Sequence, residues 1–376
     1  MVGMTESLKG SSAFDARLTE ITSIGRVPAS RTPRKAASSA KADQTSATDQ
    51  VQCCDVLILG RGPAASAAAL TATRLGLSTV MMAPRRPIVP TPAEMVPAGF
   101  TSALARIGVR HRSLCRQGHF SAAGRDTLAG WHVDRVQLDL LLLRAAVRSG
   151  ARLRHEMPEA PIQENGRIGG VVCAGGLVRS RVLIDASGSA AWLRRSLGLR
   201  RTALSDPLIA ARGQVRGVLP FLGADGMRFT PHPSGWTLMI AHDGLVSWTV
   251  LCTDGQHPEA PGSVALLPET IRTSHAAVGW QLTRPVAGDG WLIAGDAGGR
   301  IDPAGGSGLS DALASGARAA HAAGLCLQGD GPTAAARSAY DDWFAEMITQ
   351  RAAELSRRYE AHGIRLDRHP MRRRAA

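Results

Sequence analysis

The segment Asp55–Gly76 reads DVLILGRGPAASAAALTATRLG, and it decides the predicted fold. Val56–Leu59 is a short apolar run, typical of a strand that is buried on both faces. The turn Gly60–Gly62 follows, and the alanine-rich stretch Pro63–Leu75 predicts a helix with proline at its first position. Because Leu77–Met82 reads as a second apolar strand, the segment predicts a β-α-β unit of a parallel sheet.

The turn of this unit has the form G-x-G-x-x-G/A, with Gly60, Gly62, Pro63, Ala64 and Ala65. Glycine at the first position permits the tight turn, and glycine at the second lets a pyrophosphate approach the backbone. The small residue at the third position keeps helix and strand close, while the start of the helix supplies partial positive charge. We therefore predict a dinucleotide phosphate site here.

One element of such a site is missing. An acidic residue usually ends the second strand and binds the ribose hydroxyls, but this chain reads MMAPR over Met81–Arg85, with Ala83 in the middle. The ribose is then held by backbone groups or by Arg85, or adenosine binding is weaker than usual.

Two later segments repeat the combination of a strand end with aspartate and glycine. Val178–Asp185 predicts a strand that runs into the turn Asp185–Gly188 and the helix Ala190–Leu197. The predicted strand Trp291–Ala294 is followed directly by Gly295, Asp296 and Ala297. An aspartate at a strand end can accept hydrogen bonds from ribityl hydroxyls.

The glycine-rich stretch PAGGSG at Pro303–Gly308 opens the predicted helix Leu309–Leu327. Such a loop can approach a flavin ring and stabilise negative charge on it. An ordinary surface turn would explain this stretch or Asp296 alone, but not both features so close together.

Four motifs recur in this order in one superfamily: Gly60–Ala65, Trp131–Arg135 (WHVDR) with Leu138-Asp139, Asp185–Gly188, and Gly295-Asp296 with Asp302-Pro303. The chain resembles FAD monooxygenases of the p-hydroxybenzoate hydroxylase type. Within them it is most similar to the branch that holds tryptophan halogenases, geranylgeranyl reductases and the flavoproteins that mature peptide-derived quinone cofactors. The resemblance covers about residues 53–330.

The resemblance implies FAD as the cofactor. It implies that Arg135 and Asp185–Gly188 lie along the FAD pyrophosphate side, that Asp296 meets the ribityl–phosphate region and that Asp302–Gly308 flanks the isoalloxazine. The predicted cofactor-binding residues are Gly60, Gly62, Pro63, Ala64, Ala65, Arg135, Asp185, Gly188, Asp296, Pro303, Gly305, Gly306 and Gly308. The chain has no second G-x-G-x-x-G, so NAD(P)H binds transiently or a separate reductase supplies the electrons.

The predicted fold class is α/β, with an FAD-binding Rossmann-like domain of the glutathione-reductase type and an inserted antiparallel substrate sheet. The region 207–285 carries strand-like pieces, such as Trp236–Ile240 and Leu245–Cys252, that are joined by Pro/Gly turns. The predicted parts are a disordered extension at 1–50, the FAD-binding domain at 51–206 and 286–330, the substrate sheet at 207–285 and a helical segment at 331–376.

The expected function is monooxygenation, in which a flavin hydroperoxide hydroxylates an aromatic or peptide-borne substrate. The alternatives are a flavin-dependent reductase of isoprenoid-type double bonds and a non-catalytic accessory or maturation flavoprotein that binds a partner polypeptide. Halogenation is not predicted, because the resemblance implies a catalytic lysine in the halogenases of the branch and this chain has none after Lys41. Their W-x-W-x-I-P segment is also absent, since Gly235–Ile240 reads GWTLMI.

No catalytic acid or base can be assigned from the sequence. His232, Trp236 and His242 are weak candidates in the predicted substrate sheet, and a histidine near a flavin could move protons near neutral pH. Residues of these types are more often structural, and Trp236, Trp248 and Trp280 are expected in the core or a pocket wall.

Composition excludes other classes of function. The formal charge is +13, but the only lysines precede residue 50 and the arginines are scattered, so no nucleic-acid site is predicted. No stretch approaches the roughly 18–20 apolar residues of a membrane-spanning helix. The six cysteines have no C-x-x-C spacing, which suits reduced thiols in a cytoplasmic protein. The expected partners are a small-molecule or peptide substrate and a reductase or partner polypeptide; no metal site is predicted.

Overall fold

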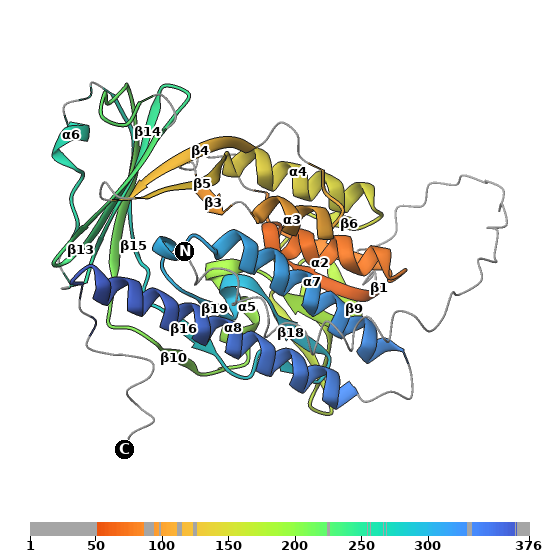
Figure 1. Cartoon of the computed structure of the whole chain (residues 1–376). Helices are drawn as coiled ribbons and strands as arrows, with labels where there is room; N and C mark the ends of the chain where they lie inside the picture. The colour runs from red at the N-terminus through yellow and green to blue at the C-terminus, as the bar shows by residue number, and fades with distance from the viewer. Residues whose placement is uncertain are drawn as a thin grey trace, which may run out of the picture. The chain divides into compact units, whose positions relative to one another are not determined.

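The computed structural model describes residues 51–366 except for 86–93, 98, 111–114, 123–125, 224–225, 254, 256, 266, 268, 329–332 and 365. The extension predicted at 1–50 and the tail after residue 366 lie outside this set. Within it, the strands form two eight-stranded sheets and one three-stranded sheet (Figure 1). The chain is therefore a mixed α/β protein, as predicted.

The first sheet contains the predicted β-α-β unit. Its central strand β1 (Gln52–Leu59) pairs in parallel with β2 (Thr79–Met82) on one side and with β9 (Gly176–Asp185) on the other. Two more parallel strands follow outward, β6 (Arg152–Arg154) next to β2 and β18 (Trp291–Ile293) next to β9. The last four residues of β1 are buried, as the apolar run predicts.

Antiparallel strands make this sheet mixed. β17 (Ala287–Gly288) pairs with β18, while β8 (Arg167–Cys173) joins the amino end of β9 and carries β7 (Ala160–Glu164) as its own partner. The carboxyl ends of β1, β2, β9 and β18 thus share one edge, where ligands bind in open parallel sheets.

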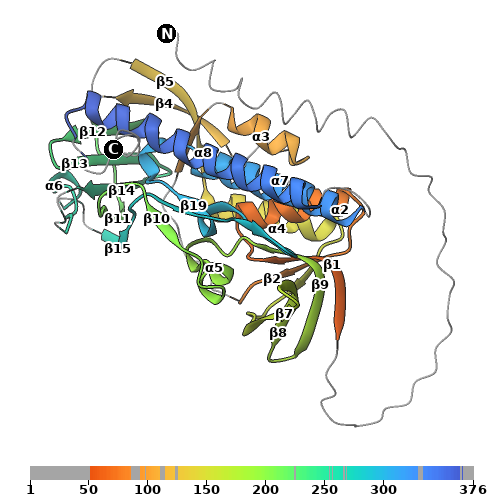
Figure 2. The same ribbon diagram turned by 90° about the horizontal axis from the view of Figure 1, so that it is seen from below.

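Several helices pack against this sheet and on one another. Their bounds are α2 (Pro63–Arg74), α3 (Phe100–Arg106), α4 (Arg135–Arg148), α5 (Trp192–Ser196), α6 (Gly262–Ala265), α7 (Gly308–Leu327) and α8 (Thr333–Ala361). α2 lies between α4 and α7, and α8 runs along α7 (Figures 1 and 2). A β-carbon on Gly316 of α7 would stand 2.0 Å from the Ala64 carbonyl oxygen, so glycine lets α7 touch the backbone of α2.

The second eight-stranded sheet has the order β15-β11-β14-β13-β12-β4-β5-β3. Its strands are β3 (Glu94–Pro97), β4 (Cys115–Ala122), β5 (Asp126–Val133), β11 (Ile209–Arg216), β12 (Gly226–His232), β13 (Gly235–His242), β14 (Leu245–Cys252) and β15 (Glu269–Ala277). All its pairings are antiparallel except β4 with β12. The predicted strands at 236–240 and 245–252 are confirmed, but β3, β4 and β5 come from outside 207–285.

The third sheet joins β10 (Arg201–Ala203), β16 (Gln281–Thr283) and β19 (Gly299–Arg300). Next to it, a core cluster of Trp236, Trp280, Leu355 and Tyr359 connects the antiparallel sheet to α8. Trp236, Trp248 and Trp280 are buried, which confirms the core prediction for them. In the part of the chain that the structure covers, no helix is long and apolar enough to cross a bilayer.

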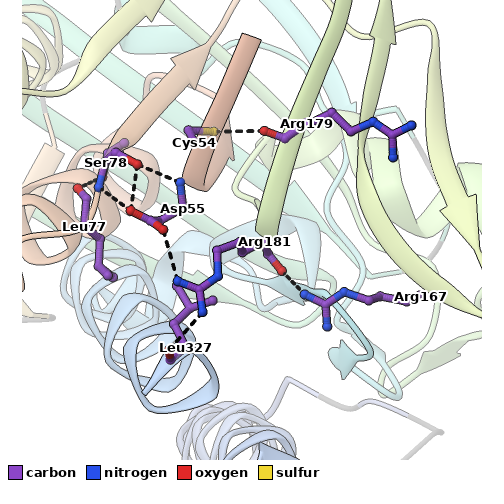
Figure 3. Close-up of polar contacts among 9 residues, drawn as sticks. Cys54, Asp55, Leu77, Ser78, Arg167, Arg179, Arg181 and Leu327 are labelled. Atoms are coloured by element: carbon purple, nitrogen blue, oxygen red, sulfur yellow. Dashed lines mark hydrogen bonds and ion pairs between the residues drawn. The ribbon is translucent and has the colours of Figure 1, made fainter. Parts of the chain in front are cut away.

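A polar network holds the amino ends of the central strands together (Figure 3). The Asp55 carboxylate accepts hydrogen bonds from the Ser78 hydroxyl at 2.7 Å, from the Ser78 backbone N–H at 2.9 Å and from Arg181 at 3.2 Å. Arg181 also donates to the Leu327 carbonyl at the end of α7, at 3.0 Å. β1, β2, β9 and α7 are therefore tied at the edge opposite the strand ends that carry the glycine turns.

We expect Asp55→Asn to lower the free energy of unfolding by about 1–2 kcal/mol at neutral pH, because the ion pair and charge-assisted bonds are lost. Hydrogen bonds from Ser78 and Arg181 lower the pKa of Asp55 from 3.8, so its contribution is present above that value and disappears as the pH falls through the lower, folded-state pKa. Urea unfolding of both proteins from neutral to acidic pH measures the difference.

Glu164→Gln is the matched control, since Glu164 pairs with Arg179 but its side chain is 54% exposed. An exposed pair contributes less than about 1 kcal/mol. Equal losses in the two variants would contradict the role given to Asp55.

Candidate functional site: the carboxyl edge of the parallel strands

Three turns meet at the carboxyl edge of the first sheet. β1, β9 and β18 end in register, with Leu59 beside Asp185 and Asp185 beside Ile293. Backbone hydrogen bonds join the turns, from Ala186 N–H to the Leu59 carbonyl and from Ala294 N–H to the Asp185 carbonyl, each at 2.9 Å. The segments that begin at Gly60, Ala186 and Gly295 are thus brought together as the sequence predicts.

The two glycines of the first turn have different tasks. Gly60 has φ +121°, and a β-carbon there would stand 2.3 Å from the Ala186 carbonyl oxygen, so only glycine fits. Gly62 has φ −78° and begins α2 without a side-chain cap. A β-carbon on Gly62 would meet no described atom within 4 Å. Gly60 therefore shapes the turn, whereas Gly62 leaves its backbone open to a ligand.

The other predicted glycines also differ in whether a β-carbon would meet neighbouring atoms. Gly188, Gly306 and Gly308 have open space at the β-carbon position, again judged against the described atoms, and the first two have φ of +65° and +64°. Gly305 is packed, because its β-carbon would lie 3.1 Å from Ile301 Cδ1. The three open glycine positions thus lie on the turn after β9, in the loop before α7 and at the first residue of α7.

Pro63, Ala64 and Ala65 are buried in the first turn of α2. Their side chains support the turn and make the close contacts of α2 with β1 and α7. Only the backbone N–H groups of Ala64 and Ala65 remain suited to bind a ligand, because proline has no N–H.

Arg135 begins α4 and is held by two carboxylates, Glu94 at 2.5 Å and Asp139 at 3.4 Å. Burial alone would lower its pKa, but the two carboxylates outweigh burial and raise it. The Nε atom of Arg135 is buried and, among the described groups, has no hydrogen-bond partner. Arg135 is therefore a fixed cation that keeps one donor unused.

Asp296 lies in the short helix η3 (Gly295–Ala297), and its side chain is exposed. Desolvation raises its pKa, while Arg300 and Arg135 act in the opposite direction. No hydrogen bond or ion pair from the described side chains reaches its carboxylate, which is thus a ready acceptor for hydroxyl groups.

Two arginines near Asp296 were not predicted. The Arg201 and Arg300 Nε atoms are buried without a partner in the described structure. Burial lowers the pKa of Arg201, and repulsion from Arg194 and Arg300 lowers it further. The edge therefore carries excess positive charge. Arg300 stands four residues after Asp296 and could have been found from that spacing, whereas Arg201 gives no sequence signal.

Asp185 does not present a free carboxylate. It is fully buried, and its two oxygens accept from the backbone N–H groups of Ser187 at 2.9 Å and Leu193 at 2.8 Å. Burial raises its pKa, and these hydrogen bonds oppose the rise. Its carboxylate holds the turn that carries Gly188 in place, so direct contact of this side chain with a ligand, as the predicted site has it, does not agree with the geometry.

The sequence predicts that the end of β2 lacks the usual acidic residue and carries Ala83 and Arg85 instead. Ala83 is buried and donates to the Arg154 carbonyl at 3.1 Å, and Arg85 is exposed. An aspartate or glutamate side chain is thus absent from the described end of this strand, and the adjoining residues 86–93 lie outside the structure's described part.

The three weak catalytic candidates are not brought together. His232 and His242 lie at different ends of the β12–β13 hairpin, beside Gly235 and Leu245. The His232 Nδ1 atom contacts the Ser234 hydroxyl at 3.3 Å, and His242 contacts Asp243 at 3.2 Å. None of these contacts reaches the glycine turns.

Trp236 is fully buried and donates to the Tyr359 hydroxyl at 2.5 Å. It cannot touch a substrate from this position. The same hydroxyl donates to Asp302, at the start of the loop before α7. Tyr359 was not predicted, because nothing in its local sequence indicates a contact 57 residues back along the chain.

Together these features define an α/β protein whose carboxyl edge carries open glycine backbone, an exposed carboxylate without a described partner, and arginines with unused donors. Residues of this kind fit FAD, since the pyrophosphate needs N–H and guanidinium donors and the ribityl chain needs an acceptor.

Comparison with known proteins finds enzymes that are similar to this chain. No protein-family model matches the chain. A 1H-pyrrole-2-carbonyl-[peptidyl-carrier protein] brominase from Pseudoalteromonas luteoviolacea is 27% identical, over 82% of this chain and 86% of the relative. A digeranylgeranylglycerophospholipid reductase from Methanoculleus marisnigri is also 27% identical, over 78% of this chain and 82% of the relative.

Solved structures share the fold. A flavin-dependent brominase has a TM-score of 0.71 at 22% identity, over 83% of this chain and 88% of its own. A peptidyl tryptophan dihydroxylase essential for tryptophylquinone cofactor biogenesis has a TM-score of 0.69 at 18% identity, over 82% of this chain and 75% of its own. The resemblance that the motifs indicated is confirmed: halogenases, reductases and a dihydroxylase of the same flavoprotein branch are similar to this chain. These similarities support an FAD-dependent oxidoreductase.

Proposed function

We propose that the protein is an FAD-dependent monooxygenase that hydroxylates an aromatic or peptide-borne substrate. The observation that carries the proposal is the open carboxyl edge, where Gly62 leaves backbone accessible and Asp296 offers an unpaired carboxylate beside arginines. The likeness to a peptidyl tryptophan dihydroxylase supports oxygen insertion, and a brominase relative that acts on a carrier-protein substrate supports a peptide-borne one.

In this proposal the described residues bind and orient FAD. The start of α2 at Gly62 and the Gly188 turn hold the pyrophosphate, with Arg135 as a nearby cation, and Asp296 accepts from the ribityl hydroxyls. The loop Pro303–Gly308, with its open glycines, flanks the isoalloxazine. Bound and reduced FAD supplies the activation of O₂, and the antiparallel sheet forms the wall that keeps water from the substrate.

The remaining parts of the proposal concern the organisation of the chain. We propose the glutathione-reductase type for the cofactor domain, with 207–285 as the substrate sheet and with β3, β4 and β5 contributing to that sheet. NAD(P)H or a separate reductase supplies the electrons. The described cysteines are all free, which agrees with the proposed cytoplasmic location.

Spectroscopy and mass spectrometry test the function. We expect the purified full chain to carry FAD or to bind it on incubation, with the absorbance bands of a flavoprotein. After anaerobic reduction with dithionite, air and a tryptophan-containing peptide should give a product with one added oxygen atom. A protein that stays colourless with excess FAD would overturn the proposal and favour the non-catalytic accessory function.

Halogenation is the second candidate function, because the brominase relative matches 82% of the chain. The absence of lysine after Lys41 speaks against it. The same reaction in the presence of bromide, with pyrrole-2-carboxylate as a second probe, separates the two: bromine in the product supports halogenation, and oxygen supports our proposal.

Reduction of isoprenoid-type double bonds is supported by the reductase relative. Reduced protein that saturates a geranylgeranyl lipid, and does not transfer oxygen, would favour this alternative over both others.

A further inference from the structure

A chain of hydrogen bonds runs through the core beside the loop that precedes α7. The Asp302 carboxylate accepts from Trp280 Nε1 at 2.6 Å and from the Tyr359 hydroxyl at 2.8 Å, both on the same oxygen. The Tyr359 hydroxyl in turn accepts from Trp236 Nε1 at 2.5 Å. All four side chains are at most 2% exposed, so the chain is shielded from water.

The four residues come from separate parts of the fold. Trp236 lies on β13 of the antiparallel sheet, Trp280 stands directly before β16, and Tyr359 lies near the end of α8. Asp302 precedes the short helix η4 (Pro303–Gly305). The carboxylate thus joins the antiparallel sheet, the three-stranded sheet and the C-terminal helix at one point.

Asp302 transmits this attachment to the loop. Its second oxygen accepts from the Ala304 N–H at 2.9 Å and caps η4. The residues that follow include Gly306 and Gly308, whose β-carbon positions are open. Movement of Tyr359 or Trp280 would therefore move the carboxylate and, through Ala304, the start of this open loop.

Burying the Asp302 carboxylate costs free energy, and its hydrogen bonds offset part of that cost. Desolvation raises the pKa of Asp302 to about 6, although the hydrogen bonds from Trp280, Tyr359 and Ala304 lower it. No ion pair to Asp302 occurs among the residues that the structure covers, and Tyr359 is the one titratable side chain that contacts it. The group thus changes charge close to neutral pH without a neighbouring cation.

We propose that Asp302 and Tyr359 are positioning residues that hold the loop Pro303–Gly308 at the reactive end of the flavin, so that the C-terminal helix α8 supports the active site. This inference rests on the proposed function, in which that loop flanks the isoalloxazine. It adds residues from α8 and from the segment before β16, neither of which belongs to the predicted cofactor-binding set.

Tyr359→Phe tests the proposal, with Tyr340→Phe as a matched control. Both tyrosines are buried on α8, and each hydroxyl makes buried hydrogen bonds; that of Tyr340 donates to the Ile293 carbonyl at 2.9 Å. Each variant loses one buried oxygen, so the two should lose similar stability. Tyr359→Phe should change the flavin more than Tyr340→Phe, whose hydroxyl contacts the end of β18 and not the loop Pro303–Gly308. We expect Tyr359→Phe to raise the Kd for FAD about three- to tenfold, and to shift the absorbance band and the reduction potential.

A pH series adds a readout that a purely structural role would not change. In the wild type, the absorbance band and potential of bound FAD should change as the pH passes about 6, where Asp302 titrates. Asp302→Asn, which cannot ionise, should remove that change. If Tyr359→Phe does not fold, Trp280→Phe removes the other donor to the same oxygen and serves in its place.

The outcomes separate this inference from the proposed function. A wild-type protein that binds no FAD overturns the proposed function and the inference with it. A wild-type protein that binds FAD, with Tyr359→Phe and Tyr340→Phe indistinguishable in Kd, spectrum and potential, overturns the inference alone.

Discussion

Replacing Gly62 by valine is expected to abolish FAD binding while the apoprotein stays folded. The backbone of Gly62 has φ −78° and ψ −172°, an extended conformation that valine adopts readily. The β-carbon would enter space that contains no described atom within 4 Å. In our proposal that space belongs to the pyrophosphate, and a branched side chain keeps the phosphate oxygens away from the N–H groups of α2.

The expected size of the effect is large. Loss of two or three charge-assisted hydrogen bonds, at about 1.5–3 kcal/mol each, raises the Kd for FAD by at least about a hundredfold. Titration with FAD, followed by the quenching of flavin fluorescence, measures the Kd. The free energy of unfolding of the apoprotein should fall by only about 1–2 kcal/mol, because valine is a poorer N-cap residue than glycine but its β-carbon meets no described atom.

Gly99→Val is the matched control. Gly99 is the N-cap of α3, its φ is −70°, and its β-carbon position is also free of described atoms within 4 Å. This variant should bind FAD like the wild type. Unchanged FAD affinity in Gly62→Val would exclude the α2 start as the phosphate site.

The strand and helix pattern of the first sheet could be predicted because local rules determine it. Four consecutive apolar residues at Val56–Leu59 suit a strand covered on both faces, and proline with alanines suits a helix start. The prediction began this strand too late, since β1 begins at Gln52 and Cys53 pairs with Arg179. The first residues of β1 lack the apolar pattern of a buried strand, so their pairing with β9 is visible only in the structure.

Long-range pairing could not be predicted. β3, β4 and β5 join the antiparallel sheet through β4 and β12, over more than a hundred residues of sequence. Several strands have a composition that would allow them to pair with the free edge of β12. Which strand pairs there therefore depends on the three-dimensional path of the chain. The same reason hid Glu94 as the partner of Arg135.

At the site, residue types were predicted better than residue roles. The turns at Gly60, Asp185 and Gly295 do meet at one edge, because parallel strands place their carboxyl ends together. The role of Asp185 depends on burial, which the sequence does not disclose: its carboxylate bonds the backbone of Ser187 and Leu193. Tyr359 could not be found at all, because its contact with Asp302 requires α8 to fold back along α7.

Gly316→Ala is expected to have the largest effect on stability. A β-carbon at Gly316 would stand 2.0 Å from the carbonyl oxygen of Ala64 and 3.0 Å from its α-carbon. Backbone atoms cannot rotate away, so α7 must separate from α2, and overpacking of this kind costs about 3 kcal/mol or more. The shift also displaces Ala64, two residues after Gly62, and FAD affinity should fall together with the urea midpoint.

Gly324→Ala on the same helix separates this contact from helix propensity. Alanine in place of a helical glycine stabilises by about 0.5–1 kcal/mol when nothing obstructs it. At Gly324 the nearest atom is Leu75 Cδ1 at 3.1 Å, the end of a flexible side chain that can turn aside. Gly324→Ala should therefore be as stable as the wild type or slightly more stable. If the two variants unfold at the same urea concentration, α7 does not touch the backbone of α2 at Ala64, and the support of the phosphate turn by α7 would have to be abandoned.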